Sequence, residues 1–303
     1  MTKTQVLTFG DDSIAIAARL ILAGEPVAVA TETVYGLAAD ATNAAAVARI
    51  YEAKGRPSFN PLIVHVPDLA AAERIGEFSE QAMSLAGEHW PGPLTLVVPL
   101  RAGAPIASLA TAGLPTIGLR VPAHPAMQAL LKAAGRPLAA PSANASGRTS
   151  PTRAEHVFRT LHGRIPLILD SGATQRGIES TIVAATGDAL SVLRPGPIDI
   201  AAERAPGGPI RSPGQLASHY APAKPLRLDA ASAADGEYLI GFGDVRGDAT
   251  LSASGDLVEA ASRLFDLLYL ADDSPQPRIA VAPVPNAGLG TAINDRLRRA
   301  AGR

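Results

Sequence analysis

The sequence predicts an α/β fold whose sheet carries polar side chains at the ends of its strands. Short apolar runs, such as residues 26–30 and 62–66, alternate with stretches that have helical periodicity. Residues 43–54 show this periodicity clearly, because their apolar side chains recur at the spacing of one helix face. Hydroxyl, amide and cationic residues lie where these strands and helices end. Open α/β sheets bind their ligands at such ends, so we expect a binding site there.

Length and composition predict two domains. The chain has 303 residues, of which 47% are hydrophobic, and this is enough for two cores. Proline and glycine dominate between Pro195 and Pro225 and indicate a linker, which also carries the pair His219–Tyr220. We therefore expect one domain over residues 1–205, a linker over residues 206–225 and a smaller α/β domain over residues 226–303.

Charge and composition exclude several classes of protein. A net charge of -1 does not suit a protein that coats nucleic acid, although a local basic patch is compatible with it. The absence of cysteine removes disulfides, thiolate metal sites and cysteine nucleophiles. The N-terminus lacks the layout of a signal peptide, and no apolar run reaches the roughly 18–20 residues of a membrane span. We therefore expect a cytoplasmic protein with no membrane partner.

Local signals predict the remaining elements in chain order. Ser79 is a candidate N-cap for the helix at residues 79–89, and the spacing of Thr152 and Glu155 resembles a capping box, which predicts a helix beginning at Arg153. Further strands are expected at 94–99, 116–121, 137–140, 166–170, 181–185, 190–194, 237–242 and 278–284, and further helices at 125–134, 255–271 and 288–300.

The stretch from Thr31 to Val66 concentrates many of the polar candidates. We expect a hydroxyl-rich turn over residues 31–36, followed by the alanine-rich helix, which ends at Gly55. Lys54 and Arg56 flank this glycine. Two cations at a helix end could simply complement the helix dipole, and only the company of other polar residues favours a binding role.

The polar residues at strand and helix ends suit the binding of phosphates and a small zwitterion. Arginine forks pair with carboxylate or phosphate, lysine supplies a compact charge, and short hydroxyls complete the contacts. The basic members are Lys54, Arg56, Arg120 and Arg194. The hydroxyl and amide members are Thr31, Thr33, Tyr35, Asn60, Thr116, Ser142, Asn144, Ser150 and Ser180.

Other chemistries find less support. The sequence contains no nucleophile elbow, no paired carboxylates with a clear partner and no histidines at metal-ligand spacing. His65, on an apolar strand, would by itself be an ordinary core histidine. The residues alone therefore indicate nucleotide or phosphate binding, with metal ligands left unassigned.

A series of motifs in this chain resembles the YrdC/TsaC family of threonylcarbamoyl-AMP synthases. The motifs follow the family's order over nearly the whole chain: ATETVYGLAADA, AKGRPSFNPLIVHV, HWPGPLTLVV, GLRVPAHP, APSANASGRTSPT, ESTIV, VLRPGPI, SPGQLASHYAP and GLGTAINDRLRRAA. The last two resemble the long form, which adds a linker and a second domain. One departure is Ala30, where the family often has proline before the turn.

The resemblance implies a fold and a reaction. The expected fold is a twisted open sheet of mixed strand direction, with a second, smaller Rossmann-like α/β domain. The expected activity is that of a nucleotidyltransferase that condenses L-threonine, bicarbonate and ATP into threonylcarbamoyl-AMP and pyrophosphate, with Mg²⁺ accompanying ATP. A downstream threonylcarbamoyl transferase complex would then modify tRNAs that read ANN codons, and a weak contact with tRNA itself is a further expectation.

The same resemblance implies roles for individual residues. Lys54 and Arg56 would be catalytic. Residues that match nucleotide contacts are Lys54, Arg56, Asn60, Thr116, Ser142, Asn144, Ser150, Arg194 and Tyr220. Residues that match positions around threonine are Thr31, Thr33, Tyr35, His65, Arg120, Ala140 and Ser180. Arg120 would provide the fork for the threonine carboxylate, and Tyr220 in the linker would close over ATP.

Two alternatives stay open at this level. The same basic concavity could instead bind tRNA or double-stranded RNA without catalysis, which the net charge argues against only weakly. The C-terminal unit could be an effector or docking domain.

Overall fold

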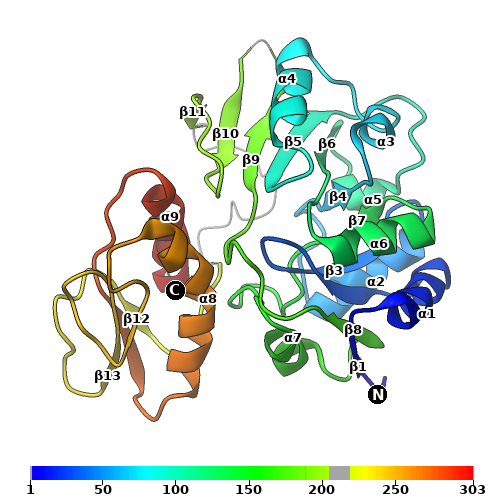
Figure 1. Cartoon of the computed structure of the whole chain (residues 1–303). Helices are drawn as coiled ribbons and strands as arrows, with labels where there is room; N and C mark the ends of the chain where they lie inside the picture. The colour runs from blue at the N-terminus through cyan, green and yellow to red at the C-terminus, as the bar shows by residue number, and fades with distance from the viewer. Residues whose placement is uncertain (1, 188, 205–218, 303) are drawn as a thin grey trace.

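The computed structural model describes residues 2–187, 189–204 and 219–302, and these residues form a mixed α/β fold with two sheets. An eleven-stranded sheet is built from residues 5–204 and a four-stranded sheet from residues 226–281. Figure 1 shows the sheets in two lobes, with helices α8 (Leu257–Asp273) and α9 (Leu289–Ala301) of the smaller lobe on the side that faces the larger lobe. The expected α/β class is confirmed.

The larger sheet mixes parallel and antiparallel neighbours, as expected. Its strands are β1 (Gln5–Thr8), β2 (Val27–Ala30), β3 (Tyr35–Asp40), β4 (Ile63–His65), β5 (Leu94–Pro99), β6 (Thr116–Arg120), β7 (Leu138–Ala139), β8 (Leu167–Asp170), β9 (Thr181–Ala184), β10 (Ser191–Arg194) and β11 (Glu203–Arg204). Their order across the sheet is β1-β8-β2-β3-β7-β4-β6-β5-β9-β10-β11. The pairs β4–β6 and β5–β9 are parallel, whereas β5–β6 and β9–β10 are antiparallel.

Helices cover both faces of this sheet, which explains why its central strands read as continuous apolar runs. The helices are α1 (Asp11–Leu22), α2 (Ala44–Lys54), α3 (Leu69–Glu73), α4 (Glu80–His89), α5 (Ser108–Thr111), α6 (Pro125–Ala134) and α7 (Ala154–Leu161). Helices α1 and α6 pack together over one core, whose members include Ile21 and Leu130. Helix α2 contributes Val47 and Ile50 to the other core.

The turn after β2 is shorter than predicted. The prediction that it leads directly into a helix is wrong, because a strand comes between them. Residues 35–40 form β3, which pairs antiparallel with β2 and, at its far end, with β7. The Thr31 hydroxyl donates to the Val34 carbonyl (2.7 Å) and accepts from the amides of Thr33 (3.1 Å) and Val34 (3.2 Å). One side chain thus closes a tight hairpin. The alanines of β3 favour helix in isolation, but pairing on both edges overrides that preference.

The capping-box prediction at α7 is also wrong. The helix begins at Ala154, and its N-cap residue Arg153 makes no side-chain cap. Thr152 instead donates from Oγ1 to Asp266 Oδ1 of α8 (2.6 Å), and Arg153 donates from Nε to Asp266 Oδ2 (2.8 Å). The Thr152 hydroxyl, which the sequence predicts as a helix cap, therefore makes a contact between the lobes instead.

The smaller lobe is a parallel sheet with two helices, in keeping with the Rossmann-like arrangement expected. Its strands are β12 (Leu226–Arg227), β13 (Glu237–Gly241), β14 (Ala249–Thr250) and β15 (Arg278–Val281), in the order β12-β15-β13-β14. Buried side chains of the sheet, such as Ile240, pack with Phe265 of α8 and Ile293 of α9.

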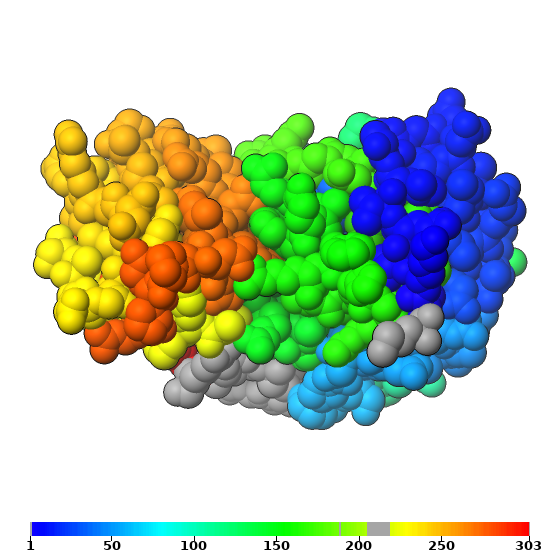
Figure 2. All heavy atoms as spheres, turned by 90° about the horizontal axis from the view of Figure 1, so that it is seen from below, coloured from blue at the N-terminus to red at the C-terminus, as the bar shows by residue number. Residues whose placement is uncertain are grey.

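The two lobes are joined by specific contacts between α7 and α8. The rings of His156 and Tyr269 stack with centroids 3.9 Å apart, and Arg159 pairs with Asp273 at 2.6 Å. In Figure 2 the green segment that contains α7 and the orange segment that contains α8 lie against each other. Of the linker predicted over residues 206–225, residues 206–218 lie outside the described residues. Within the described ranges, no helix is both long and apolar enough to cross a bilayer.

Candidate active site

A small cavity lies where strand ends of the larger sheet meet the residues that follow the linker. Its volume is about 40 Å³. It is bounded by the turn after β2, the carboxyl ends of β4 and β6, the start of β9, the end of β10 and the His219–Tyr220 pair. Its lining residues are Thr31, Thr33, Val34, Gly36, Arg56, Ile63, His65, Arg120, Ala140, Pro141, Ser142, Glu179, Ser180, Arg194, His219 and Tyr220. The structure thus brings most of the predicted site residues to one hollow.

Arg120 lies at the carboxyl end of β6 with most of its donors engaged. Its Nη2 donates to Glu32 Oε1 (2.6 Å), its Nη1 to Thr33 Oγ1 (3.1 Å) and its Nε to the Gly92 carbonyl (3.2 Å). Burial opposes the charge of Glu32, but the Arg120 guanidinium outweighs it and lowers the pKa of that carboxyl below its usual value. A guanidinium has five N–H donors, so Arg120 keeps two for a ligand.

Arg194, at the end of β10, organises the opposite wall. It donates from Nε to the Ser180 carbonyl (3.1 Å) and from Nη2 to Ser180 Oγ (3.1 Å). The Ser180 hydroxyl also lies 2.8 Å from Thr95 Oγ1 of β5. Burial lowers the pKa of Arg194 from its usual value. These bonds fix the Ser180 hydroxyl at the start of β9, facing the cavity.

Arg56 follows the left-handed Gly55 (φ 61°) that ends α2 as predicted. Its Nε donates to the Asn60 carbonyl (3.2 Å) and its Nη2 to the Pro61 carbonyl (3.0 Å). Burial lowers the pKa of Arg56 to about 10, so the guanidinium is still charged at neutral pH. The loop over residues 57–61 is therefore wrapped around a cation that faces the cavity.

Lys54 does not line the cavity but supports its rim. The Nζ atom donates to the Ser142 carbonyl (2.5 Å), the Asn144 carbonyl (2.6 Å) and Asn144 Oδ1 (3.3 Å). These three acceptors use all the donors of an ammonium group. Burial, followed by the charge of Arg56, lowers the pKa of Lys54 well below its usual value. Through these three hydrogen bonds Lys54 fixes the turn at residues 142–144.

His65, at the end of β4, is a buried neutral base. Burial and then the charge of Arg120 lower its pKa to about 3. The strands β4 and β6 pair in parallel with His65 opposite Arg120, so both side chains reach the same edge of the sheet. An uncharged imidazole beside a guanidinium can accept a hydrogen bond from a bound amine.

Four buried polar atoms, three in the cavity lining and one on the adjoining loop around Arg56, make no hydrogen bond of normal geometry among the described residues. They are Asn60 Oδ1, His65 Nδ1, His219 Nδ1 and the Tyr220 hydroxyl. Buried polar atoms are nearly always paired in folded proteins, so a cluster of unpaired ones marks a place where a ligand or water belongs. Three cations and these four atoms together define a site for an anionic, polar ligand.

Some predicted residues lie outside the cavity lining. Tyr35 sits in β3 and donates from its hydroxyl to the Gly172 carbonyl (2.7 Å), next to β8. Thr116 lies at the start of β6, at the other end of the strand from Arg120. Asn144 binds Lys54 and donates from Nδ2 to the Arg148 carbonyl (2.7 Å). Ser150 donates from Oγ to Glu179 Oε1, and so reaches the site through a lining residue.

The sequence interpretation missed four residues at this site. Glu32 and Glu179 are both 5% exposed and pair with Arg120 and Arg296 respectively. His219 lines the cavity beside Tyr220. All four stood inside motifs already singled out, but Glu179 and Arg296 lie in motifs far apart in the chain, and no local signal joins the two residues.

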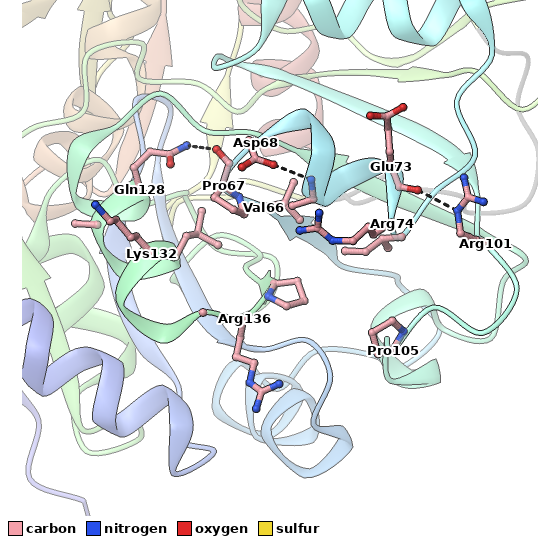
Figure 3. Close-up of a pocket in the computed structure, with 16 residues that line it drawn as sticks. Val66, Pro67, Asp68, Glu73, Arg74, Arg101, Pro105, Gln128, Lys132 and Arg136 are labelled. Carbon is pink, nitrogen blue, oxygen red and sulfur yellow. Dashed lines mark hydrogen bonds between the residues drawn. The ribbon is translucent and has the colours of Figure 1, made fainter.

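A much larger cavity among the described residues lies elsewhere and has a different lining. It has a volume of about 1170 Å³ and lies between α3, α6 and the loop over residues 101–105. Figure 3 shows Arg74, Arg101, Lys132 and Arg136 around it; all four are exposed, and none of the predicted site residues lines it. We place the active site in the smaller cavity because the buried cations and the unpaired polar atoms are there.

Metal coordination by the protein alone is not supported by the carboxylates at hand. Among the described residues no group of three or more histidine, cysteine or acidic side chains could hold a metal ion. Glu32 and Glu179 are each paired with an arginine. Mg²⁺ that enters with a nucleotide is held mainly by phosphate oxygens and water, and so needs no such cluster.

Fold and site together define an α/β protein that binds small anionic ligands at strand ends, and comparison with known proteins assigns the family. A family model described as "Telomere recombination", of the Sua5/YciO/YrdC type, matches residues 19–196. A second, described as "Threonylcarbamoyl-AMP synthase, C-terminal domain", matches residues 174–302. The chain belongs to the Sua5/YciO/YrdC family, in the long form with a C-terminal domain.

Individual relatives support this assignment over the whole chain. A Bacillus subtilis (strain 168) protein named threonylcarbamoyl-AMP synthase is 41% identical, and the alignment covers 99% of this chain and 96% of the relative. The crystal structure of Pyrococcus abyssi Sua5 complexed with L-threonine matches with a TM-score of 0.89 at 35% identity and covers 100% of this chain and 98% of that one. A structure of the same protein, in which an adjacent histidine and tyrosine are replaced by alanine, matches with a TM-score of 0.88 at 34% identity. It covers 100% of this chain and 97% of that one.

Proposed function

We propose that this protein is a transferase of the nucleotidyltransferase class that makes threonylcarbamoyl-AMP from L-threonine, bicarbonate and ATP. The observation that carries the proposal is the convergence of Arg56, Arg120 and Arg194 on one buried cavity with unpaired polar atoms. The full-length likeness to a protein of that name, and to a structure complexed with L-threonine, supports it.

Threonine would occupy the end of the cavity formed by the β2–β3 turn and the ends of β4 and β6. Arg120 has two free donors for the threonine carboxylate, and Thr33 accepts from the same guanidinium. The neutral imidazole of His65 and the Ser180 hydroxyl face this end as hydrogen-bond partners for the amine and the side-chain hydroxyl. Ala140 packs so closely against Gly36 that a Cβ added at Gly36 would come within 3.3 Å of the Ala140 Cβ, so both positions call for small residues.

The nucleotide would occupy the other end, between Arg56 and Arg194. Arg56 presents a charged guanidinium at the end of α2, and Ser142 lies on the turn that Lys54 fixes. Asn60 contributes an unpaired Oδ1 from the loop around Arg56. These groups would neutralise a triphosphate, and Mg²⁺ bound with ATP would supply further charge stabilisation.

The chemistry then depends on positioning more than on a covalent nucleophile. The threonine amine attacks bicarbonate, which loses water and leaves a carbamate. A carbamate oxygen attacks the α-phosphorus of ATP, the bond to the β-phosphate oxygen breaks, and pyrophosphate leaves with the electron pair. Arg56 and Arg194 would stabilise the charge that develops on the phosphates. The proton that the amine loses leaves with the hydroxyl of bicarbonate as water, and the neutral imidazole of His65 can orient the amine by accepting a hydrogen bond from it.

The substrates cannot enter the cavity as it stands. About 40 Å³ is room for little more than one water, whereas ATP needs several hundred Å³. His219 and Tyr220 are buried and form part of the cavity wall. Their movement would open it, and their return over the substrates would exclude water from a labile mixed anhydride.

The geometry does not favour the RNA-binding alternative. Arg56, Arg120 and Arg194 are each less than a tenth exposed, so they cannot lie along the phosphates of a duplex. A downstream threonylcarbamoyl transferase complex, and any weak contact with tRNA, would use surfaces other than this cavity.

Pyrophosphate release tests the proposed function. With ATP and Mg²⁺ present, release should require both threonine and bicarbonate, and stoichiometric threonylcarbamoyl-AMP should be detected by mass spectrometry. Serine in place of threonine lacks one methyl group and should be used more poorly by about one order of magnitude. Release of pyrophosphate that is independent of threonine would reject the proposal.

A further inference from the structure

Arg296 of α9 is a side chain of the smaller lobe that reaches the active site of the larger lobe. It is 0% exposed and is the largest fully buried side chain among the described residues. An arginine is rarely buried to this degree unless all its donors are used. Its contacts therefore indicate what it is for.

The contacts of Arg296 converge on the cavity wall. Its Nε donates to Glu179 Oε2 (3.0 Å), its Nη2 to the Glu179 carbonyl (3.3 Å) and its Nη1 to the Pro195 carbonyl. The guanidinium carbon lies 5.5 Å from the centroid of the Tyr220 ring. Glu179 and Tyr220 both line the cavity, and Pro195 directly follows Arg194.

The effect of Arg296 on charge is specific. Glu179 is a carboxylate in the wall of a site that must take a triphosphate, and an unpaired carboxylate there would repel it. Arg296 neutralises one oxygen of Glu179, and the other accepts from the Ser150 hydroxyl. Burial opposes charge on Arg296, but Tyr220, Glu179 and Asp295 outweigh it and raise its pKa. Arg296 therefore stays charged beside the Glu179 carboxyl group.

We propose that Arg296 is a positioning residue through which the smaller lobe completes the nucleotide site: it holds Glu179 and supports the Tyr220 ring, so that nucleotide affinity depends on a docked second lobe. This inference rests on the proposed function for its kinetic readout but not for its binding readout. It assigns the C-terminal lobe a part in the catalytic site in place of a separate effector or partner-docking role. The match of both family models to residues 174–196, which contain Glu179 and Pro195, is consistent with a segment shared by the two lobes.

The test compares Arg296→Met with Arg298→Met, an exposed arginine two positions along the same helix. Arg296→Met should weaken binding of ATP with Mg²⁺ by at least about tenfold in calorimetry and raise the KM for ATP by a similar factor. Arg298→Met should change neither by more than about twofold. Threonine binding at the Arg120 end should stay within about twofold in both variants.

A second substitution separates positioning from a loss of folding. Adding Glu179→Gln to Arg296→Met removes the unpaired charge, so it should recover at least about threefold in ATP affinity. Arg296→Lys keeps the charge without the fork and should fall between wild type and Arg296→Met. ATP affinity of Arg296→Met within twofold of wild type, or no recovery in the double variant, would overturn the proposal. If the wild type binds ATP but releases no pyrophosphate, the proposed function fails while these binding results still decide the role of Arg296.

Discussion

Arg120 Nη2 lies 2.6 Å from Glu32 Oε1, and both side chains are almost fully buried at the edge of the active-site cavity. The pair joins the turn after β2 to the end of β6. A buried pair contributes little relative to an apolar core, but breaking it by removing one partner leaves an uncompensated charge. The two residues thus determine how the turn that carries Thr31 and Thr33 is held.

Glu32→Gln should lower the free energy of unfolding by about 3 kcal/mol at pH 7, because the Arg120 charge loses its partner. The folded-state pKa of Glu32 is lowered, so the contribution of the pair is present above the unfolded pKa and is lost as the pH falls through the folded value. The difference between wild type and variant, measured by urea unfolding, should therefore shrink below about pH 4. The matched control is Glu25→Gln, which breaks an exposed pair with Arg49 and should cost at most about 1 kcal/mol.

Arg56→Ala should lower kcat/KM for pyrophosphate release by at least about 100-fold, because it removes both the charge and the bonds that shape the loop over residues 57–61. Steady-state kinetics with ATP varied at saturating threonine and bicarbonate would measure this. Arg74→Ala in the large exposed cavity is the control and should behave as wild type. Equal kinetics for the two variants would remove Arg56 from the nucleotide site.

The pKa of His65 makes a prediction about acid stability. Its folded-state pKa is about 3, below the usual value of 6.5, so the unfolded chain binds the extra proton between those two values. Its contribution to stability is complete above about pH 6.5 and falls as the pH is lowered, by at most about 1.4 kcal/mol per pH unit. His65→Gln should have a shallower decline of unfolding free energy between pH 6.5 and 4.5. Parallel declines would show that His65 is not held neutral.

Tyr220 can be divided into its ring and its hydroxyl. The ring packs against Phe265 (5.8 Å between centroids) and beside Arg296, whereas the hydroxyl makes no hydrogen bond of normal geometry among the described residues. Tyr220→Ala should raise the KM for ATP by roughly tenfold and increase hydrolysis of the adenylate, because the mouth of the site stays open. Tyr220→Phe should keep the closed form. If Tyr220→Phe alone reproduces the defect, the hydroxyl contacts substrate and closure by the ring is not the cause.

The sequence predicted the elements whose signals are local. Helix α6 and strand β5 have the bounds expected, and Gly55 adopts the left-handed conformation that its position after α2 suggested. Strand β3 was missed because six residues rich in alanine and glycine have no strand preference of their own. They become a strand only between β2 and β7, and this pairing is a property of the assembled sheet.

The site was predictable in its members more than in its contacts. Arg56, Arg120 and Arg194 were recognised as cations at element ends, and the structure places all three on one cavity. The partners of the cations could not be read from spacing, since Glu32 and Arg120 are 88 residues apart and Glu179 and Arg296 are 117 apart. Tyr35 was predicted as a site residue because it lies in a recognised motif. Its place in β3 instead directs its hydroxyl to the Gly172 carbonyl, to which it donates a hydrogen bond.

The burial of Tyr220 in the wall of the small cavity has a consequence for ligand discovery. A compound library screened in silico against this conformation would reject ATP itself on size and would rank fragments no larger than a few heavy atoms. An inhibitor that carries its own aromatic group could displace Tyr220 and stack against Phe265 and Arg296 in its place. Such a molecule would gain affinity by occupying the position of the Tyr220 ring, and selectivity from its contacts with Phe265 and Arg296 of the smaller lobe.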